Sequence, residues 1–267
     1  MTTVRAIDRL PEFRDAKIEQ RARDYIINGV KYARVTSALG VINKPALVPW
    51  ARNQAFEALR AVWLDPTFIP DVGQLDHHDA KSLAAFCDVW IDEAKRRPES
   101  QKVAAELGTQ AHALIHRLLE GDTAAAEEIP EGLRPAVLGA SRFLRDNRIQ
   151  PVRTEFTVWD QQQKLAGTID GVGWRDGNLV IWDWKRSKGL YPEMALQLAS
   201  YANLFELTTS TRVNEAWVVR LPQAAVPDGE PMYEAKQVSD LAASLRVYRL
   251  AYNLQQGLKA DPWRQTP

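Results

Sequence analysis

Cysteine is almost absent from this sequence, since Cys87 is the only one among 267 residues. A single thiol excludes an internal disulfide framework and any multi-cysteine site for zinc or an iron–sulfur cluster. The lack of a signal-peptide pattern agrees with this, and together they favour a reducing, cytoplasmic setting. We expect Cys87 to be a core residue, because it falls in the apolar stripe of a predicted helix at residues 81–97.

Long apolar runs, an excess of one charge and a phosphate-cradling loop are also missing. No apolar run approaches the roughly 20 residues that a membrane span needs, which argues against a membrane partner. Lys plus Arg and Asp plus Glu both total 34, so any contact with nucleic acid must come from a local patch. No glycine-rich loop with Lys and Ser or Thr is present, which excludes ATP as a cofactor of a built-in motor.

The remaining composition, 45% hydrophobic and 25% charged, is that of an ordinary globular protein. Periodicity and turn signals predict helices at residues 101–120 and 133–146, strands at 153–159, 167–174 and 179–185, a helix at 191–207, a strand at 213–221 and a helix at 235–259. The strands before and after the third of these helices should pair in parallel, whereas the hairpin between the second and third strands is antiparallel. We therefore predict an α/β fold with a mixed sheet and helices on both faces.

The first hundred residues lack a comparable set of strands. Their hairpin signal is the Asn28-Gly29 pair between β-prone runs at residues 25–32. A short helix at residues 37–42 and longer helices follow. We expect residues 1–100 to form a helical cap packed on a core of residues 101–267.

The hairpin at residues 167–185 carries three charged side chains. Asp170 lies inside its first strand, and Asp183 and Lys185 lie two residues apart at the end of the second, on one face. Two carboxylates and a lysine at the end of a hydrophobic strand are costly to half-bury unless something there needs them. We hypothesise that a divalent metal ion and a phosphodiester need them. The simpler interpretation is a strand-end surface pair, with Asp170 capping a turn.

Magnesium suits this hypothesis, because it prefers hard oxygen ligands, keeps its waters and lowers their pKa. Asp170 and Asp183 are the predicted metal ligands, with the backbone carbonyl of Trp184 beside them. Lys185 would orient the attacking water or stabilise the developing charge. Gln197, on the following helix, would position the strand or Lys185.

Two residues on preceding elements extend this candidate site. His112 would complete the coordination from its helix, although a histidine that merely flanks an apolar stripe is the simpler interpretation. His116, one turn later, would allow the pair to chelate a metal, but a solvated pair is commoner. Glu155 alternates with apolar neighbours, so it points either toward Asp170 or, from an edge strand, toward solvent.

The joint order of these residues resembles the RecB-like branch of the PD-(D/E)XK nuclease superfamily, over roughly residues 101–220. The matching motifs are His112, Asp170 after Gly167, Asp183-Trp184-Lys185, and the helix with Gln197 and Tyr201. The resemblance implies a restriction-endonuclease-like α/β/α core that depends on Mg²⁺, with Mn²⁺ able to substitute. It also implies cleavage of DNA, usually from ends or in single strands.

The resemblance has further parts and one departure. Tyr201 is expected to contact DNA, although an ordinary helix face with the tyrosine in the core is the simpler interpretation. Arg186 and Lys188 are expected to meet flanking phosphates. Arg186 stands where family members often have Thr, although Ser187 follows. Relatives with an iron–sulfur cluster need four cysteines, which excludes that subgroup. The segment at residues 35–50 more loosely resembles the region before the core in phage-type exonucleases and in the mitochondrial genome maintenance exonuclease.

The sequence thus favours a metal-dependent deoxyribonuclease, an exonuclease on single-stranded or end-containing DNA. Its setting would be DNA repair, recombination or phage DNA processing in the cytoplasm of a prokaryotic or phage-infected cell. A protein partner or a homo-oligomer stays open. The alternatives are a structure-specific endonuclease or an RNase of the same fold, and a non-catalytic nucleic-acid-binding protein that retains the fold.

Overall fold

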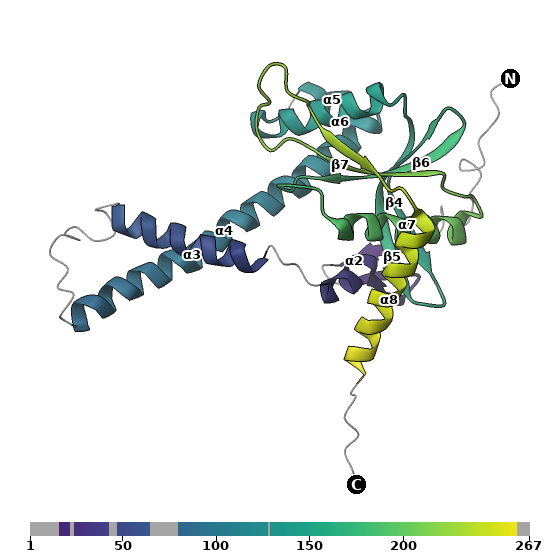
Figure 1. The fold of residues 1–267 in the computed structure, drawn as a ribbon. Coiled ribbons are helices and arrows are strands. Elements are labelled where there is room, and N and C mark those ends of the chain that lie inside the picture. The colour runs from purple at the N-terminus through teal and green to yellow at the C-terminus, as the bar shows by residue number, and fades with distance from the viewer. Residues whose placement is uncertain (1–15, 22–23, 43–46, 65–79, 128, 261–267) are drawn as a thin grey trace, which may run out of the picture. The chain divides into compact units, whose positions relative to one another are not determined.

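The structure is a computed structural model that describes residues 16–21, 24–42, 47–64, 80–127 and 129–260 (Figure 1). Its contacts divide the chain into two compact units, the first made of Met1–Ile42 and Gln110–Pro267 and the second of Asn43–Thr109. The strands between Ile18 and Arg34 join the sheet of the larger unit. The expected division at residue 100 stays a prediction. The packing of a helical cap on the core stays a prediction.

Eight strands of the larger unit form one mixed sheet. They are β1 (Ile18–Gln20), β2 (Asp24–Ile27), β3 (Val30–Arg34), β4 (Gln150–Asp160), β5 (Leu165–Arg175), β6 (Asn178–Lys185), β7 (Glu215–Arg220) and β8 (Glu234–Gln237). Their order is β1-β2-β3-β5-β6-β7-β8, with β4 also paired to β5. The pairs β3–β5 and β6–β7 are parallel and the others antiparallel, which confirms the predicted crossover and hairpin.

The sheet forks along one edge of β5. β4 pairs with β5 from Leu165 to Trp174, so it occupies one edge over nearly the whole strand. The other edge pairs with β3 at Leu165 and Ala166, and with β6 only from Gly171 onward. The four residues between, 167–170, lie where this edge changes partner, and they include Asp170.

The helices are α2 (Val35–Ala38), α3 (Leu47–Leu64), α4 (Ala80–Leu119), α5 (Thr123–Glu127), α6 (Arg134–Asp146), α7 (Pro192–Thr209) and α8 (Leu241–Lys259), with 3₁₀ turns at Leu39–Val41 and Glu131–Leu133. None of the helices in the described ranges is long and apolar enough to cross a membrane. The smaller unit holds α3 and the first part of α4, where Trp90 Nε1 donates to the Ala55 carbonyl at 3.0 Å.

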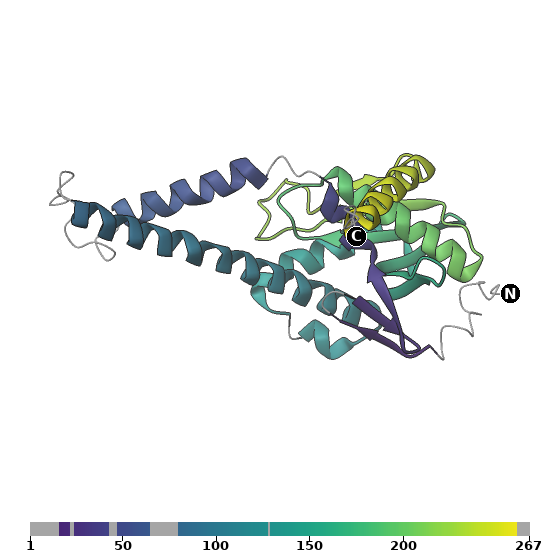
Figure 2. The same cartoon turned by 90° about the horizontal axis from the view of Figure 1, so that it is seen from below.

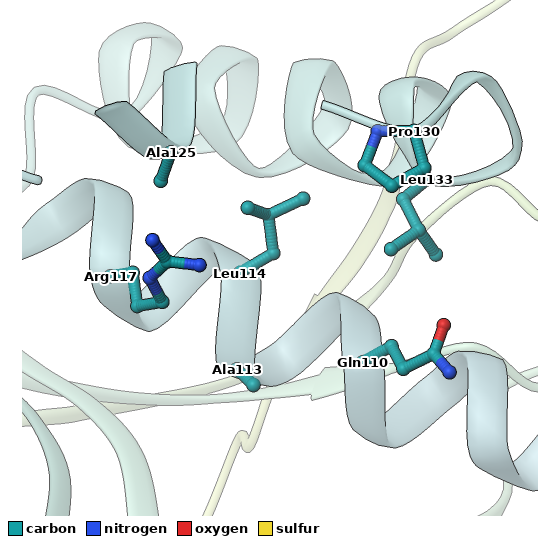
Figure 3. Close-up of a pocket in the computed structure, with 7 residues that line it drawn as sticks. All are labelled: Gln110, Ala113, Leu114, Arg117, Ala125, Pro130 and Leu133. Atoms are coloured by element: carbon teal, nitrogen blue, oxygen red, sulfur yellow. The ribbon is translucent and has the colours of Figure 1, made fainter. Parts of the chain in front are cut away.

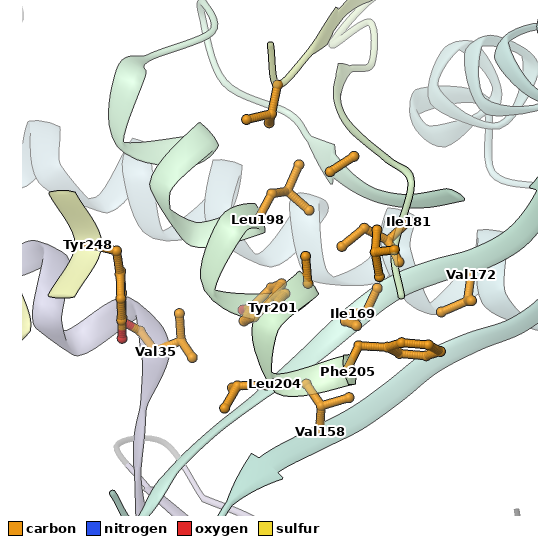
Figure 4. Close-up of a cluster of buried hydrophobic side chains, with 14 of the residues drawn as sticks. Val35, Val158, Ile169, Val172, Ile181, Leu198, Tyr201, Leu204, Phe205 and Tyr248 are labelled. Atoms are coloured by element: carbon orange, nitrogen blue, oxygen red, sulfur yellow. The ribbon is translucent and has the colours of Figure 1, made fainter. Parts of the chain in front are cut away.

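The main hydrophobic core lies between the sheet and α7, with α2 and α8 at its side (Figure 4). Ile169 and Ile181 on the strands pack with Leu198 and Phe205 of α7, and all four are fully buried. The opposite face of the sheet is covered by α6, whose Phe143 ring meets Trp184 edge-on at 5.7 Å. The predicted α/β architecture with helices on both faces is confirmed, and Figure 2 shows the same elements from below.

Both predicted hairpin turns have the backbone that their residues favour. Asn28 and Gly29 have φ of 50° and 78°, and Asp176 and Gly177 have φ of 48° and 85°. Two consecutive positive φ angles define the two-residue turn whose twist matches antiparallel strands, and Asn-Gly and Asp-Gly tolerate it best. The turn at Asp176 sets the register that pairs Gly171 with Trp182 at the fork.

Three local predictions are wrong. The two helices expected at residues 81–97 and 101–120 are one 40-residue helix, because strong helix formers on both sides outweigh the donor missing at Pro98. Cys87 is exposed on this helix rather than buried. The last helix does not begin at residue 235: β8 comes first, and the Asp240 carboxylate then caps α8 by accepting from the Ala243 N–H at 2.8 Å.

Candidate active site

Asp170 lies at the fork of the sheet, where β5 and β6 separate. The last backbone pair between these strands is Gly171 with Trp182. Two residues further along β6, the Trp184 N–H donates to Asp170 Oδ2 at 2.7 Å, so a side chain replaces the backbone acceptor that the neighbouring strand would supply. This bond fixes the carboxylate, whose side chain is 11% exposed, at the end of the paired region.

Two residues from other elements meet Asp170. His112, on the last three turns of α4, places Nδ1 3.4 Å from Asp170 Oδ2. Glu155 lies opposite Asp170 on β4, because its neighbours Thr154 and Phe156 pair with Gly171 and Ile169. Ligand-type atoms of His112, Glu155 and Asp170 all lie within 4.8 Å of one another. Of the two interpretations of Glu155, the structure favours the one that points toward the cluster.

A second group of side chains lies at the end of β6 and on α7. Asp183 is 3% exposed, and its Oδ2 lies 2.5 Å from Nζ of Lys185. Gln197 Nε2 donates to Asp183 Oδ1 at 3.1 Å and to the Tyr201 hydroxyl at 2.9 Å. Lys185 Nζ in turn donates to Gln197 Oε1 at 3.4 Å. The predicted role of Gln197 in positioning Lys185 fits these distances.

Gly167 is needed for this second group. A Cβ atom at this position would come within 2.3 Å of the Tyr201 ring. The glycine that precedes Asp170 by three residues therefore makes room for the tyrosine that supports Gln197, which in turn holds Asp183 and Lys185. Tyr201 itself is 4% exposed and belongs to the core. Tyr201 was expected to contact DNA, but its buried ring is not accessible to a DNA strand. Its hydroxyl instead accepts from Gln197.

The charges around Asp170 support one another. Burial disfavours the imidazolium of His112, but the carboxylates of Asp170 and Asp183 outweigh burial and raise its pKa to about 9. Burial likewise disfavours an ionised Asp170, yet the charges of His112 and Lys185 and the Trp184 N–H hold its pKa below the ordinary value.

The other two carboxyl groups are shifted the opposite way. Burial raises the pKa of Asp183 to about 6, the charge of Asp170 adds to the rise, and Lys185 only partly offsets it. Burial and the charge of Asp170 also raise the pKa of Glu155 to about 7. Burial would lower the pKa of Lys185, but Asp183 and Asp170 raise it, so the ammonium persists. Three carboxyl groups thus crowd a site whose own residues supply too little positive charge.

This crowding fits a divalent cation. His112, Glu155 and Asp170 converge as possible ligands. Oδ2 of Asp183 is buried and accepts no hydrogen bond from the described residues, although Lys185 lies beside it. A hard cation with oxygen ligands would compensate the carboxylates that raise one another's pKa. The Trp184 N–H contacts Asp170, so the Trp184 backbone lies beside this cluster. Its carbonyl stays a predicted metal ligand.

Arg186 and Lys188, the two basic residues that follow Lys185 in the chain, have different surroundings. The Arg186 guanidinium donates to the Gln223 carbonyl at 3.1 Å, so it anchors the loop after β7. Lys188 is exposed. Both stay predicted phosphate contacts.

The shared metal site considered for His112 and His116 is not supported by the contacts of His116. His116 Nδ1 is hydrogen-bonded to the Thr154 hydroxyl, which itself donates to Glu120 Oε1 at 2.9 Å. Sequence reasoning did not predict a role for Thr154 or Glu120, and it considered His116 only as a partner of His112. The sequence spacing could have indicated them, because His112, His116 and Glu120 recur every four residues, which is the spacing of one helix face.

A pocket of about 280 Å³ lies on another side of α4 (Figure 3). It is lined by Gln110, Ala113, Leu114, Arg117, Ala125, Pro130 and Leu133. Figure 3 shows Leu114 and Leu133 extending toward the space between them. None of the predicted site residues lines this pocket. The pocket is therefore separate from the candidate site at the fork, which is identified by its charged side chains.

A crystal structure titled "Crystal structure of SSO0001" is similar to the chain at 18% identity, over 54% of this chain and 75% of the other, with a TM-score of 0.26. A TM-score this low supports no conclusion. No curated protein matches the sequence.

A family model described as "PD-(D/E)XK nuclease superfamily" matches residues 89–266, about two thirds of the chain. The mixed eight-stranded sheet with flanking helices agrees with the restriction-endonuclease-like core that this superfamily has. The site residues, from His112 to Tyr201, lie within the matched range. The chain therefore belongs to the PD-(D/E)XK nuclease superfamily, whose nucleases usually use divalent metal ions.

Proposed function

We propose that this chain is a Mg²⁺-dependent deoxyribonuclease of the RecB-like branch, acting as an exonuclease on single-stranded or end-containing DNA. The observation that carries the proposal is the joint site at the fork: His112, Glu155 and Asp170 within 4.8 Å, beside the buried pair of Asp183 and Lys185. Its order along the chain is the one that motivated the RecB-like resemblance.

The residues divide the work of hydrolysis. His112, Glu155, Asp170 and Asp183 would hold the ion, together with the Trp184 carbonyl. A bound Mg²⁺, or Mn²⁺ in its place, neutralises phosphate oxygens and lowers the pKa of water. Lys185 stays protonated between Asp183 and Gln197, so it is suited to orient the attacking water or to stabilise negative charge that develops on the phosphate.

The substrate strand would be held beside the fork. Arg186 and Lys188 follow the signature directly and would contact phosphates on either side of the scissile bond. The chain has no net charge, so contacts with phosphates would have to come from individual basic residues such as these two. We place the activity in DNA repair, recombination or phage DNA processing, in the cytoplasm of a prokaryotic or phage-infected cell, with a protein partner or a second copy of the chain.

The test is digestion of DNA labelled at either the 5′ or the 3′ end, single- or double-stranded, with Mg²⁺, with Mn²⁺ or with a chelator. We expect mononucleotides or short products to be released from one end of linear DNA, only when the metal is present. The matched control is the Asp183→Ala variant, which should release nothing. Full activity in this variant would contradict the proposed site.

Two further substrates separate the alternatives. Cleavage of closed circular single-stranded DNA would show an endonuclease, since an exonuclease leaves a circle intact. Cleavage of an RNA strand of the same sequence, with DNA left whole, would show an RNase. DNA binding without any cleavage in either metal would show a non-catalytic binding protein.

A further inference from the structure

Thr154 connects two elements that carry possible metal ligands. Its side chain belongs to β4, directly before Glu155, and the residue is 9% exposed. Its hydroxyl donates to Glu120 Oε1 at 2.9 Å and is hydrogen-bonded to His116 Nδ1. Because a hydroxyl has a single proton, the bond from His116 must be donated by the imidazole N–H. His116 lies on α4, one turn after His112, and Glu120 directly follows the end of this helix.

Glu155 has a backbone conformation that glutamate seldom adopts. Its φ is 49°, in the left-handed region, in the middle of an 11-residue strand. For a residue with a Cβ atom, this region is less favourable than ordinary backbone, because the Cβ atom comes too close to the following carbonyl oxygen. Such strained positions persist only where the surrounding structure holds them, and they cluster at functional sites.

The unusual backbone changes where the side chains of β4 point. In a regular strand, Thr154 and Phe156 would face the same side of the sheet. Here Thr154 bonds to α4, whereas Phe156 packs on Phe205 of α7, with ring centroids 5.6 Å apart. The alternation is therefore broken at Glu155. As a result its carboxylate joins His112 and Asp170, on the α4 side of the sheet.

We propose that Glu120, Thr154 and His116 form a clamp that holds Glu155 in its left-handed conformation and so keeps its carboxylate in the metal site. The clamp also fixes the distance between β4, which carries Glu155, and α4, which carries His112. These are positioning residues, since they act through Glu155 and His112 and touch no substrate. The inference rests on the proposed function only in that the cluster binds a divalent ion.

The test measures metal binding directly, with Mn²⁺ as the probe and the purified full-length chain, by titration calorimetry or by the electron paramagnetic resonance signal of free Mn²⁺. Thr154→Val removes the hydroxyl and keeps the shape of the side chain. We expect it to weaken Mn²⁺ binding by about tenfold or more, the usual effect of losing a residue that orients metal ligands. Thr154→Ser keeps the hydroxyl and should restore most of the affinity.

Thr157→Val is the matched control. Thr157 lies on the same strand, but its hydroxyl faces Thr168 of β5 at 3.3 Å rather than α4. The same substitution there should leave Mn²⁺ affinity close to that of the unmodified chain. An equal loss in both variants would overturn the clamp, because the effect would then belong to any threonine of β4.

A double-mutant cycle tests whether the clamp acts through Glu155. In a Glu155→Gln background, Thr154→Val should cause a clearly smaller further loss of Mn²⁺ affinity than it causes alone. If Thr154→Val reduces Mn²⁺ affinity by the same factor in both backgrounds, the clamp does not act through Glu155. If Thr154→Val unfolds the chain, as judged by metal-free thermal melting, Glu120→Ala takes its place, because it removes the acceptor of the Thr154 hydroxyl. Wild-type affinity in that variant overturns the clamp.

The outcomes separate this inference from the proposed function. Wild-type chain that binds no Mn²⁺ would overturn both. Wild-type chain that binds Mn²⁺, with Thr154→Val equally tight, would overturn the clamp alone. Metal binding that depends on Thr154, in a chain that cleaves no nucleic acid, would support the clamp and contradict the proposed nuclease activity.

Discussion

The two halves of the candidate site differ in how their charges are compensated. On the α7 side, Asp183 already has a cation beside it, Lys185, and an amide donor, Gln197. On the α4 side, Glu155 and Asp170 share one imidazole, His112. The first half contains an ion pair that holds the lysine in place. The second half has two carboxylates and one imidazole, so it depends more strongly on a further cation. This difference suggests that metal binding and charge stabilisation can be separated by substitution.

The largest effect is expected where the two halves meet. Asp170→Ala removes the carboxylate that accepts from the Trp184 N–H and contacts His112, so both halves lose a partner. We expect metal-dependent cleavage to fall to background, measured by the release of end-labelled nucleotides. Folding should persist, as judged by circular dichroism. Residual activity within tenfold of wild type would show that the halves do not depend on Asp170.

A pair of variants tests the separation itself. Lys185→Met keeps the length of the side chain and removes its charge, so cleavage should fall by about a hundredfold or more, as when a charge-stabilising donor is lost. Mn²⁺ affinity should stay near wild type or rise. Glu155→Gln should instead weaken Mn²⁺ binding, with part of the activity regained at high metal concentration. The same response in both variants would contradict two separable halves.

Gly167→Ala probes the packing beneath the α7 half. The added Cβ atom would meet the Tyr201 ring at 2.3 Å, so the ring or the strand must shift. We expect a loss of about 1–3 kcal/mol in the free energy of unfolding, measured by urea denaturation. Gly257→Ala is the control, because nothing lies within 4 Å of that position on α8, and alanine should stabilise the helix slightly.

The smallest effect is expected for Tyr201→Phe. The change removes one acceptor of Gln197 Nε2 and leaves its bond to Asp183 in place. We expect a loss of about 0.5–1.5 kcal/mol in stability and a cleavage rate only a few-fold lower. A rate as low as that of Lys185→Met would mean that Tyr201 acts in the reaction rather than in positioning Gln197. Mn²⁺ affinity is the readout that should not move.

Local chemistry explains which parts of the fold were predictable. The Asn28-Gly29 and Asp176-Gly177 turns depend on the φ preferences of two residues each, so a short stretch of sequence suffices to find them. The strand β8 and the pairing of β3 with β5 were not anticipated. Both depend on which edge of the sheet is available to the pairing segment, and that is known only once the sheet has assembled.

The site shows the same contrast. Asp170, Asp183 and Lys185 were chosen because charged groups at the end of an apolar hairpin are costly without a purpose. The sequence left the orientation of Glu155 open. It depends on one positive φ angle, at Glu155 itself, and a glutamate in a strand does not indicate such an angle. Of the two interpretations of Tyr201, its burial favours the core residue over the DNA contact. Helical periodicity left both open, because it places a residue on a face but does not say whether that face meets the core or a ligand.

The sequence by itself determined the hairpin, its three charges and their order along the chain, because strand patterning and turn chemistry act over a few residues. Only the tertiary structure decided how those charges are used. The fork in the sheet brings Asp170 to the Trp184 N–H, and the packing of α4 brings His112 to Asp170. These contacts join residues more than ten positions apart in the chain, so their geometry follows from the packing of whole elements rather than from any local preference.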